Sequence, residues 1–227
     1  MYIPKNLLII TIFIFYSIPF TYLIITLQCD KYKNKYVLSK TLNSLGFILV
    51  SIICGIIGNN INLLKVFLPG FVFCFIGDFV LGLYNNTKEQ KYFLVGLFSF
   101  LLGHIAFILA YTKIQDFMII DIVFPIIAIV ITYLLSNLKN MHCNKMTPLV
   151  CVYSFFVSLL FSKSIHILLI FKTTQFIFLA VGSSLFLISD ILILFLYFYQ
   201  KHSPAVAILN LATYYYGIFF IALSLLF

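Results

Sequence analysis

Charged residues are scarce in this sequence, and neither arginine nor tryptophan occurs in it. Only 9% of the 227 residues are charged, whereas 63% are hydrophobic. An average soluble protein is about 25% charged, so a soluble fold of this size could not cover its surface with these residues. The same composition excludes a disordered chain, because disorder requires few apolar residues.

Cysteine patterns and common catalytic motifs are also missing. The five cysteines are odd in number and form no CxxC pair, so we interpret them as packing residues. The sequence has no HExxH, GxSxG or P-loop motif, and no cofactor or metal is predicted. A zinc site built from Asp78, His104, Asp190 and His166 is conceivable, although His166 is expected at the opposite surface.

Long apolar runs dominate what is present. Each is close to the roughly 20 residues that a helix needs to cross a bilayer. The runs cover residues 6–27, 37–57, 64–84, 92–111, 117–136, 147–170, 175–198 and 205–227. Their connections leave no room for a soluble domain, so residues 1–227 are predicted to form one all-α, polytopic membrane domain with eight transmembrane helices. The sixth run contains Lys163 and His166, which suggests that its crossing ends near Phe161 and that an interfacial turn follows.

Lysine supplies all fourteen basic side chains, and its distribution predicts orientation rather than nucleic-acid binding. One side of the predicted bundle carries nine of them: Lys31, Lys33, Lys35, Lys40, Lys88, Lys91, Lys139, Lys145 and Lys201. The opposite side carries Lys5, Lys65, Lys113, Lys163 and Lys172. Cytoplasmic loops are enriched in lysine, so we expect both termini outside, in a bacterial plasma (inner) membrane.

A repeat relates the two halves of the chain. The segment around Asp78 in the third run resembles the segment around Asp190 in the seventh, 112 residues later. Gly103 in the fourth run corresponds to Gly217 in the eighth, 114 residues later. Four helices in each copy would give both copies the same orientation, which is a parallel four-plus-four repeat.

Asp78 and Asp190 are the sharpest functional candidates, because ionisable residues deep in a membrane segment are costly and mark functional sites. They lie six and eight residues before the ends of their runs, or about 9 and 12 Å at the helical rise. A pseudo-twofold axis would bring the two carboxylates face to face. Close carboxylates in a low dielectric do not both ionise easily, which prepares one acid and one base. Alternatively, each Asp only bonds a neighbouring helix.

Other polar side chains are expected at similar depths. Lys40 begins the second helix and is predicted to pair with an Asp, bind a phosphate or extend to the interface. His104 is interpreted either as a site residue or as a simple helix–helix hydrogen bond. The remaining candidates for the same cavity are Asn43, Ser44, Tyr153, Tyr214 and Tyr215.

These residues resemble the YhhN family of bacterial membrane proteins, which is related to an animal family of lysoplasmalogenases. The resemblance spans nearly the whole chain. It rests on Lys40–Leu42, Gly77–Asp78, His104, Tyr153, Gly182–Asp190 and Tyr214–Gly217. The sequence departs from the family pattern at Phe107, where Tyr is common, and at Ile218, where Gln or His is common.

The resemblance implies hydrolysis of the vinyl ether of a lysoplasmalogen to a fatty aldehyde and a glycerophospho-alcohol. Protonation of the outer vinyl carbon gives an oxocarbenium ion, which water then attacks, much as in glycosidases. Asp78 and Asp190 would be the catalytic acid and base in either order. Lys40 would bind the phosphate, with His104, Tyr153, Tyr214 and Tyr215 positioning substrate and water. The expected partners are the lysophospholipid and the lipid bilayer, with no nucleic acid and no protein partner.

Two other functions fit the residues. A proton-coupled carrier of a small or lipid-like solute would also have parallel repeats and intramembrane carboxylates. A non-catalytic lipid-binding or scaffold protein would retain lipid binding after both Asp residues are neutralised. Release of aldehyde by the purified protein distinguishes the hydrolase from both.

Overall fold

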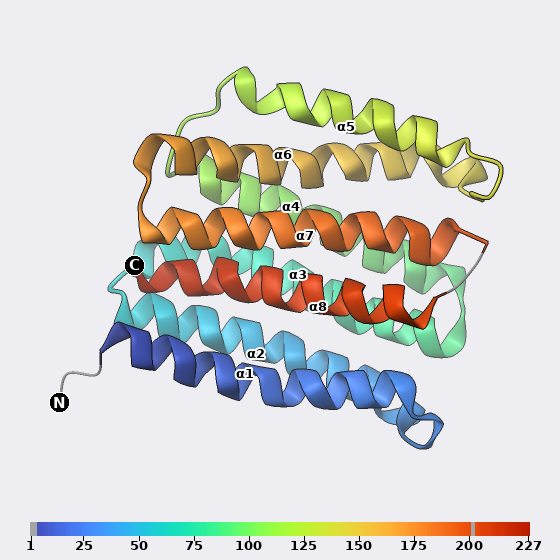
Figure 1. Cartoon of the computed structure of the whole chain (residues 1–227), viewed down its shortest axis with the longest axis horizontal. Coiled ribbons are helices and arrows are strands. Elements are labelled where there is room, and N and C mark those ends of the chain that lie inside the picture. Colours follow the sequence, from blue (N-terminus) through green and yellow to red (C-terminus); the bar gives the residue numbers. More distant parts are fainter. Residues whose placement is uncertain (1–3, 201–202) are drawn as a thin grey trace.

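The computed structural model describes residues 4–200 and 203–227, which form a bundle of eight α-helices (Figure 1). The helices are α1 (Lys5–Gln28), α2 (Tyr36–Ile57), α3 (Ile61–Thr87), α4 (Gln90–Thr112), α5 (Ile120–Ser136), α6 (Thr147–Phe171), α7 (Thr174–Phe198) and α8 (Pro204–Leu223). Short 3₁₀ helices precede α2 and α6 and follow α8. The eight predicted segments and the all-α fold class are therefore confirmed.

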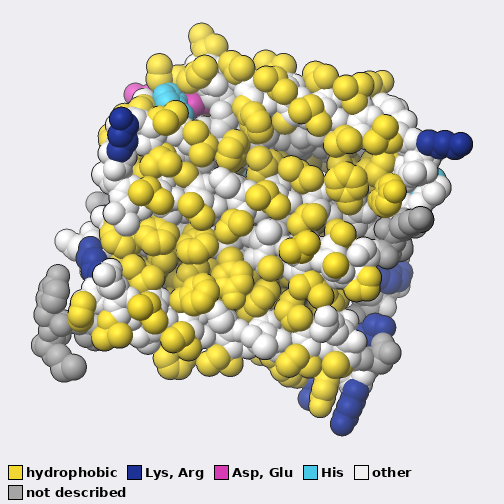
Figure 2. Space-filling view, viewed as in Figure 1, with side chains coloured by type: hydrophobic (Ala, Val, Ile, Leu, Met, Phe, Trp, Pro, Cys, Tyr) yellow, Lys and Arg dark blue, Asp and Glu magenta, His cyan; other side chains and the backbone are white. Residues whose placement is uncertain are grey.

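The outer surface of the bundle is apolar, as a membrane protein requires. Seven of the described helices are long and apolar enough to cross a membrane, and α5 is a shorter apolar helix of 17 residues. Large hydrophobic side chains such as Phe15 and Ile18 are exposed on the outside. Figure 2 shows hydrophobic side chains over the middle of the bundle and lysines at its two ends. The protein is thus an integral membrane protein.

Successive helices run in opposite directions, so the connections after α1, α3, α5 and α7 gather at the right end of Figure 1. α1 begins and α8 ends at the other end, where the Lys5 ammonium donates a hydrogen bond of 3.2 Å to the Leu226 carbonyl. This arrangement brings most of the nine-lysine set together at one end of the molecule.

The prediction that the sixth crossing ends near Phe161 is wrong, because α6 continues without a break to Phe171. The Lys163 ammonium is buried and lies 3.0 Å from an oxygen of Asp121, in the first turn of α5. His166 Nδ1 lies 2.7 Å from the other oxygen of that carboxylate. The polar residues that suggested a helix end are therefore paired with α5 inside the bundle.

Glycine contacts support the predicted repeat. Gly182 on α7 and Gly217 on α8 meet so closely that a Cβ on Gly217 would lie 3.0 Å from the Gly182 carbonyl oxygen. In the first half, a Cβ on Gly103 of α4 would lie 3.4 Å from the carbonyl oxygen of Gly70 on α3. Gly70 and Gly182 are 112 residues apart, the same offset as the two Asp residues. The packing of equivalent helices also agrees. In the repeat α8 is equivalent to α4 and α2 to α6, and α8 packs on α2 as α4 packs on α6.

Candidate functional site

The two intramembrane carboxylates lie at matching depth. Asp78 is nine residues before the end of α3 at Thr87, and Asp190 is eight before the end of α7 at Phe198. At 1.5 Å per residue these positions are about 13 and 12 Å from the helix ends. The two depths agree more closely than the sequence predicted, because α3 ends at Thr87, beyond the end of its apolar run at residue 84. Both residues are buried, with Asp78 0% and Asp190 8% exposed.

Asp78 is surrounded by hydrogen-bond donors from two helices. The Lys40 ammonium on α2 lies 3.1 Å from Oδ1. Oδ2 accepts hydrogen bonds from the Ser44 hydroxyl at 2.6 Å and from the Tyr214 hydroxyl of α8 at 2.7 Å. A buried ion pair is tolerated only when such additional hydrogen bonds offset the loss of hydration. Of the roles expected for Lys40, pairing with an Asp is confirmed.

Tyr215 supports this centre without touching the carboxylate. Its hydroxyl donates to the Lys40 carbonyl at 3.1 Å, while its own carbonyl accepts from the Tyr16 hydroxyl of α1 at 3.2 Å. Asn43 likewise faces α1, donating at 3.0 Å to the carbonyl of Pro19. We therefore interpret Tyr215 and Asn43 as residues that hold α1, α2 and α8 together around Lys40.

Asp190 has a different set of partners. His104 Nε2 on α4 lies 3.2 Å from Oδ2, and the Tyr153 hydroxyl on α6 donates to Oδ1 at 3.2 Å. The His104 ring is fully buried and packs edge-on against Tyr153, with ring centroids 5.2 Å apart. Although Nε2 lies close to Asp190, neither ring nitrogen makes a hydrogen bond among the described residues.

The carboxylates thus form two centres, each with its own basic partner, rather than one pair sharing a proton. The centres are neighbours, because the Phe186 ring packs against both His104 and Tyr214, with centroid distances of 4.8 and 5.4 Å. The expected face-to-face acid pair is therefore replaced by an Asp–Lys centre and an Asp–His centre.

A basic cavity of about 690 Å³ lies at the lysine-rich end, between α1, α2, α3, α7 and α8. Lys40 is the deepest charged residue in its lining and joins the cavity to Asp78. Its polar lining includes Lys33, Tyr36, Asn85, Lys88 and Asn210. Leucines such as Leu81 and Leu211 complete the wall, so the cavity offers both cationic and apolar contacts.

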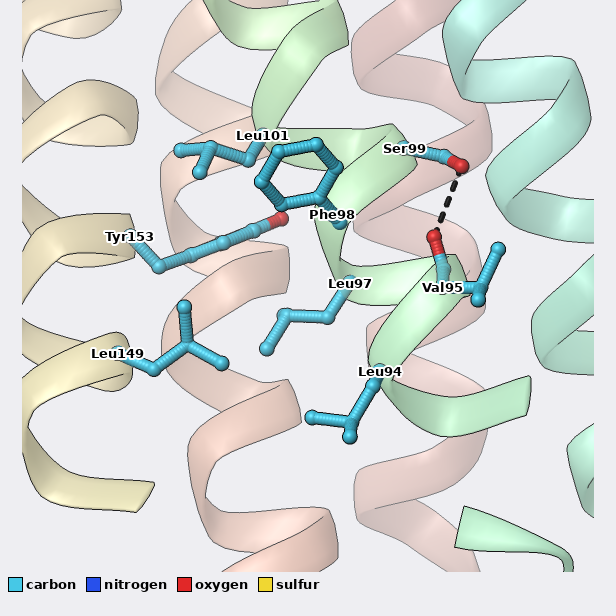
Figure 3. A pocket seen from close by; sticks show the side chains of 8 residues that line it. All are labelled: Leu94, Val95, Leu97, Phe98, Ser99, Leu101, Leu149 and Tyr153. Carbon is cyan, nitrogen blue, oxygen red and sulfur yellow. Dashed lines mark hydrogen bonds between the residues drawn. The ribbon is translucent and has the colours of Figure 1, made fainter. Parts of the chain in front are cut away.

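A second, apolar cavity of about 340 Å³ lies between α4 and α6 (Figure 3). Its wall is formed by leucine and phenylalanine side chains, including Leu97, Leu101 and Leu149. Tyr153 extends from α6 toward α4 into this wall, and its hydroxyl is the group that donates to Asp190. Each centre therefore has a cavity of its own beside it.

Some polar residues were missed by the sequence analysis. Asn210 on α8 donates hydrogen bonds to the carbonyl and hydroxyl of Ser189 at 2.9 and 3.0 Å, next to Asp190. Its position within an apolar run was the signal that could have identified it. His166 lies with Asp121, as part of a separate network, and no metal-binding group of three or more His, Cys, Asp or Glu occurs among the described residues.

Comparison with known proteins identifies one family. The model of the YhhN family matches residues 36–225, which include both carboxylates and all of their partners. No curated protein matches the chain. No solved structure matches it either.

Proposed function

The chain belongs to the YhhN family, and from this membership and the two buried centres we propose that it is a lysoplasmalogenase-like hydrolase. The reaction would cleave the vinyl ether of a lysoplasmalogen with water, giving a fatty aldehyde and a glycerophospho-alcohol. The lipid bilayer would deliver the substrate directly to a site within the bundle.

One observation carries the proposal: Lys40, which lines the basic cavity, is ion-paired with the buried Asp78. A lysophospholipid has an anionic phosphate, a short glycerol and one long chain. Lys40, with Lys33 and Lys88 in the same lining, suits the phosphate, while the leucines suit the first part of the chain. The bond to be cleaved lies a few atoms from the phosphate, so it would sit near Asp78.

The chemistry requires a proton donor and a group that stabilises a cation. Protonation of the outer vinyl carbon creates the oxocarbenium ion, water adds to it, and the hemiacetal then collapses. Asp78 and Asp190 are proposed to organise these functions, each through its own centre: one centre donates the proton and the other stabilises the cation. Tyr214, which donates to Asp78, and Tyr153, which donates to Asp190, would fix the orientations of the two carboxylates.

An assay of lipid products tests this function. The purified protein is incubated in detergent with lysoplasmalogens and, in parallel, with ester lysophospholipids of the same chain length. We expect aldehyde from the vinyl ether. Turnover should fall by about 100-fold or more in Asp78→Asn and Asp190→Asn, because removal of an acid–base group costs roughly that much. The control is Asp116→Asn, whose side chain is exposed in a loop and should leave turnover unchanged.

A second candidate, a proton-coupled carrier, is favoured by one observation. Asp78 and Asp190, at equivalent positions of the glycine-related repeat, are both buried and each lies beside a basic side chain, an arrangement suited to proton movement. A carrier would release no aldehyde and would instead move protons with its solute in sealed vesicles.

We also propose that the end containing the basic cavity faces the cytoplasm of a bacterial plasma membrane, with both termini outside. The lysine excess at the connections after α1, α3, α5 and α7 supports this orientation.

A further inference from the structure

His104 is fully buried, and neither of its ring nitrogens has a hydrogen-bond partner among the described residues. Nε2 lies 3.2 Å from the Asp190 carboxylate, whereas no carboxylate or other charged group is paired with Nδ1 among those residues. Buried polar atoms in native proteins are nearly always paired, so an unpaired nitrogen in a fully buried ring points to a partner outside the chain. With the Asp190 carboxylate beside Nε2, Nδ1–H is the group that the ring could offer to a bound molecule.

The titratable groups around His104 are few. Asp190 faces it from α7, and Tyr153 packs against its ring from α6. On α3, the Cys74 sulfur would lie 3.0 Å from a Cβ on Gly103, the residue before His104. On α8, Tyr214 is separated from it by the Phe186 ring. Asp190 is the group among these that can hold a positive imidazolium in place.

The Asp78 centre is unsuited to donating a proton. Oδ2 accepts hydrogen bonds from the Ser44 and Tyr214 hydroxyls, and the Lys40 ammonium lies 3.1 Å from Oδ1. Two hydroxyl donors and an adjacent ammonium favour the carboxylate anion over a protonated group that could act as the acid. The two carboxylates therefore differ in what they can do.

Resting on the hydrolase function proposed above, we propose that His104 is the catalytic acid of the vinyl-ether cleavage, with Asp190 as its positioning residue. The Nδ1–H bond breaks as the π electrons of the vinyl ether form a C–H bond at the outer carbon, leaving the oxocarbenium ion and a neutral imidazole. Water adds to the cationic carbon and returns one proton to Nδ1. The hemiacetal hydroxyl proton then passes to the departing glycerol oxygen, so no net oxidation or reduction occurs.

The location of His104 fits this role. Tyr153, which packs against it, also lines the apolar cavity between α4 and α6. Phe186 contacts both His104 and Tyr214, the residue that donates to Asp78, so the two centres are neighbours. The reacting carbons are proposed to lie between these centres when the substrate is bound.

Chemical rescue tests the assignment. His104→Ala leaves a space bounded by Tyr153 and Phe186 that added imidazole can fill, as small rings fill engineered apolar cavities. We expect kcat to fall by about 100-fold or more and imidazole to restore at least tenfold, in proportion to its protonated fraction. His166→Ala is the matched control, because that histidine also contacts a carboxylate, Asp121, but lies in a separate network. It should retain wild-type kcat and show no response to imidazole.

His104→Gln provides a second test if the alanine variant does not fold. Glutamine can hydrogen-bond to Asp190 but carries no transferable proton, so kcat should fall by about 100-fold or more while KM stays close to wild type. Wild-type kcat in the glutamine variant overturns the assignment, as does a folded, lipid-binding alanine variant that imidazole does not restore. A wild-type protein that releases no aldehyde overturns the hydrolase function itself, and the assignment with it.

Discussion

Removal of Lys40 alone should destabilise the protein more than removal of the whole ion pair. Lys40→Met leaves the Asp78 carboxylate buried with only two hydroxyl donors, and both side chains of the pair are at most 5% exposed. Breaking a buried pair on one side typically costs about 3–5 kcal/mol, whereas replacing both partners by uncharged groups is often close to neutral. The double variant Lys40→Met/Asp78→Asn should therefore recover most of the lost stability.

The expected change in melting temperature is measurable. For a chain of this length 1 kcal/mol shifts Tm by about 2–4 °C, so the single variant should melt about 6–20 °C below wild type. The buried thiols of Cys54 and Cys74, both 0% exposed, provide the readout. A dye that fluoresces on reaction with thiols reports their exposure as the protein unfolds in detergent.

Lys65→Met is the matched control, because Lys65 is exposed on α3 and its removal should leave Tm within about 1 °C of wild type. The reasoning is refuted if Lys40→Met melts with the wild-type protein, or if the double variant is no more stable than the single one. Both Lys40 variants should nevertheless be inactive, since each lacks the cation beside the basic cavity.

Three further predictions concern packing, the α5–α6 network and orientation. Gly182→Ala should destabilise the protein by about 1–3 kcal/mol, because its Cβ would lie 2.7 Å from the Gly217 carbonyl oxygen. Gly82→Ala is the control, because a Cβ there would make only ordinary contacts and should not destabilise the protein. Thermal unfolding of the two variants compares their stability. Lys163→Met should lower Tm as Lys40→Met does, since it leaves the buried Asp121 carboxylate without its ammonium, yet turnover per folded molecule should remain at wild type. An impermeant maleimide should label exposed Cys29, in the connection after α1, only from the cytoplasmic side; labelling in intact cells would contradict the proposed orientation.

The sequence predicts the helices well because the bilayer imposes a simple rule of length and hydrophobicity. The depth of Asp78 and Asp190 follows from the same rule. Their separate partners do not, because the rotation and packing of α2, α4, α6 and α8 decide which side chains reach each carboxylate. A linear pattern of apolar residues carries little information about that rotation.

Lys163 shows the same limit. A lysine within an apolar run indicates the end of a membrane crossing when no partner for its charge is apparent. The partner of Lys163 is Asp121, which lies 42 residues earlier in the sequence. Once α5 packs on α6, the charge is compensated and the helix continues to Phe171. Depth and helix limits are local properties, whereas pairing is a property of the assembled bundle.

The most direct test of the account is aldehyde release from a lysoplasmalogen by the purified protein. Wild-type protein should convert the vinyl ether to aldehyde and glycerophospho-alcohol in equal amounts. Asp78→Asn and Asp190→Asn should each reduce the rate by about 100-fold or more, with Asp116→Asn unchanged. No aldehyde from folded wild-type protein at saturating substrate, or an undiminished rate in Asp78→Asn, would contradict the account.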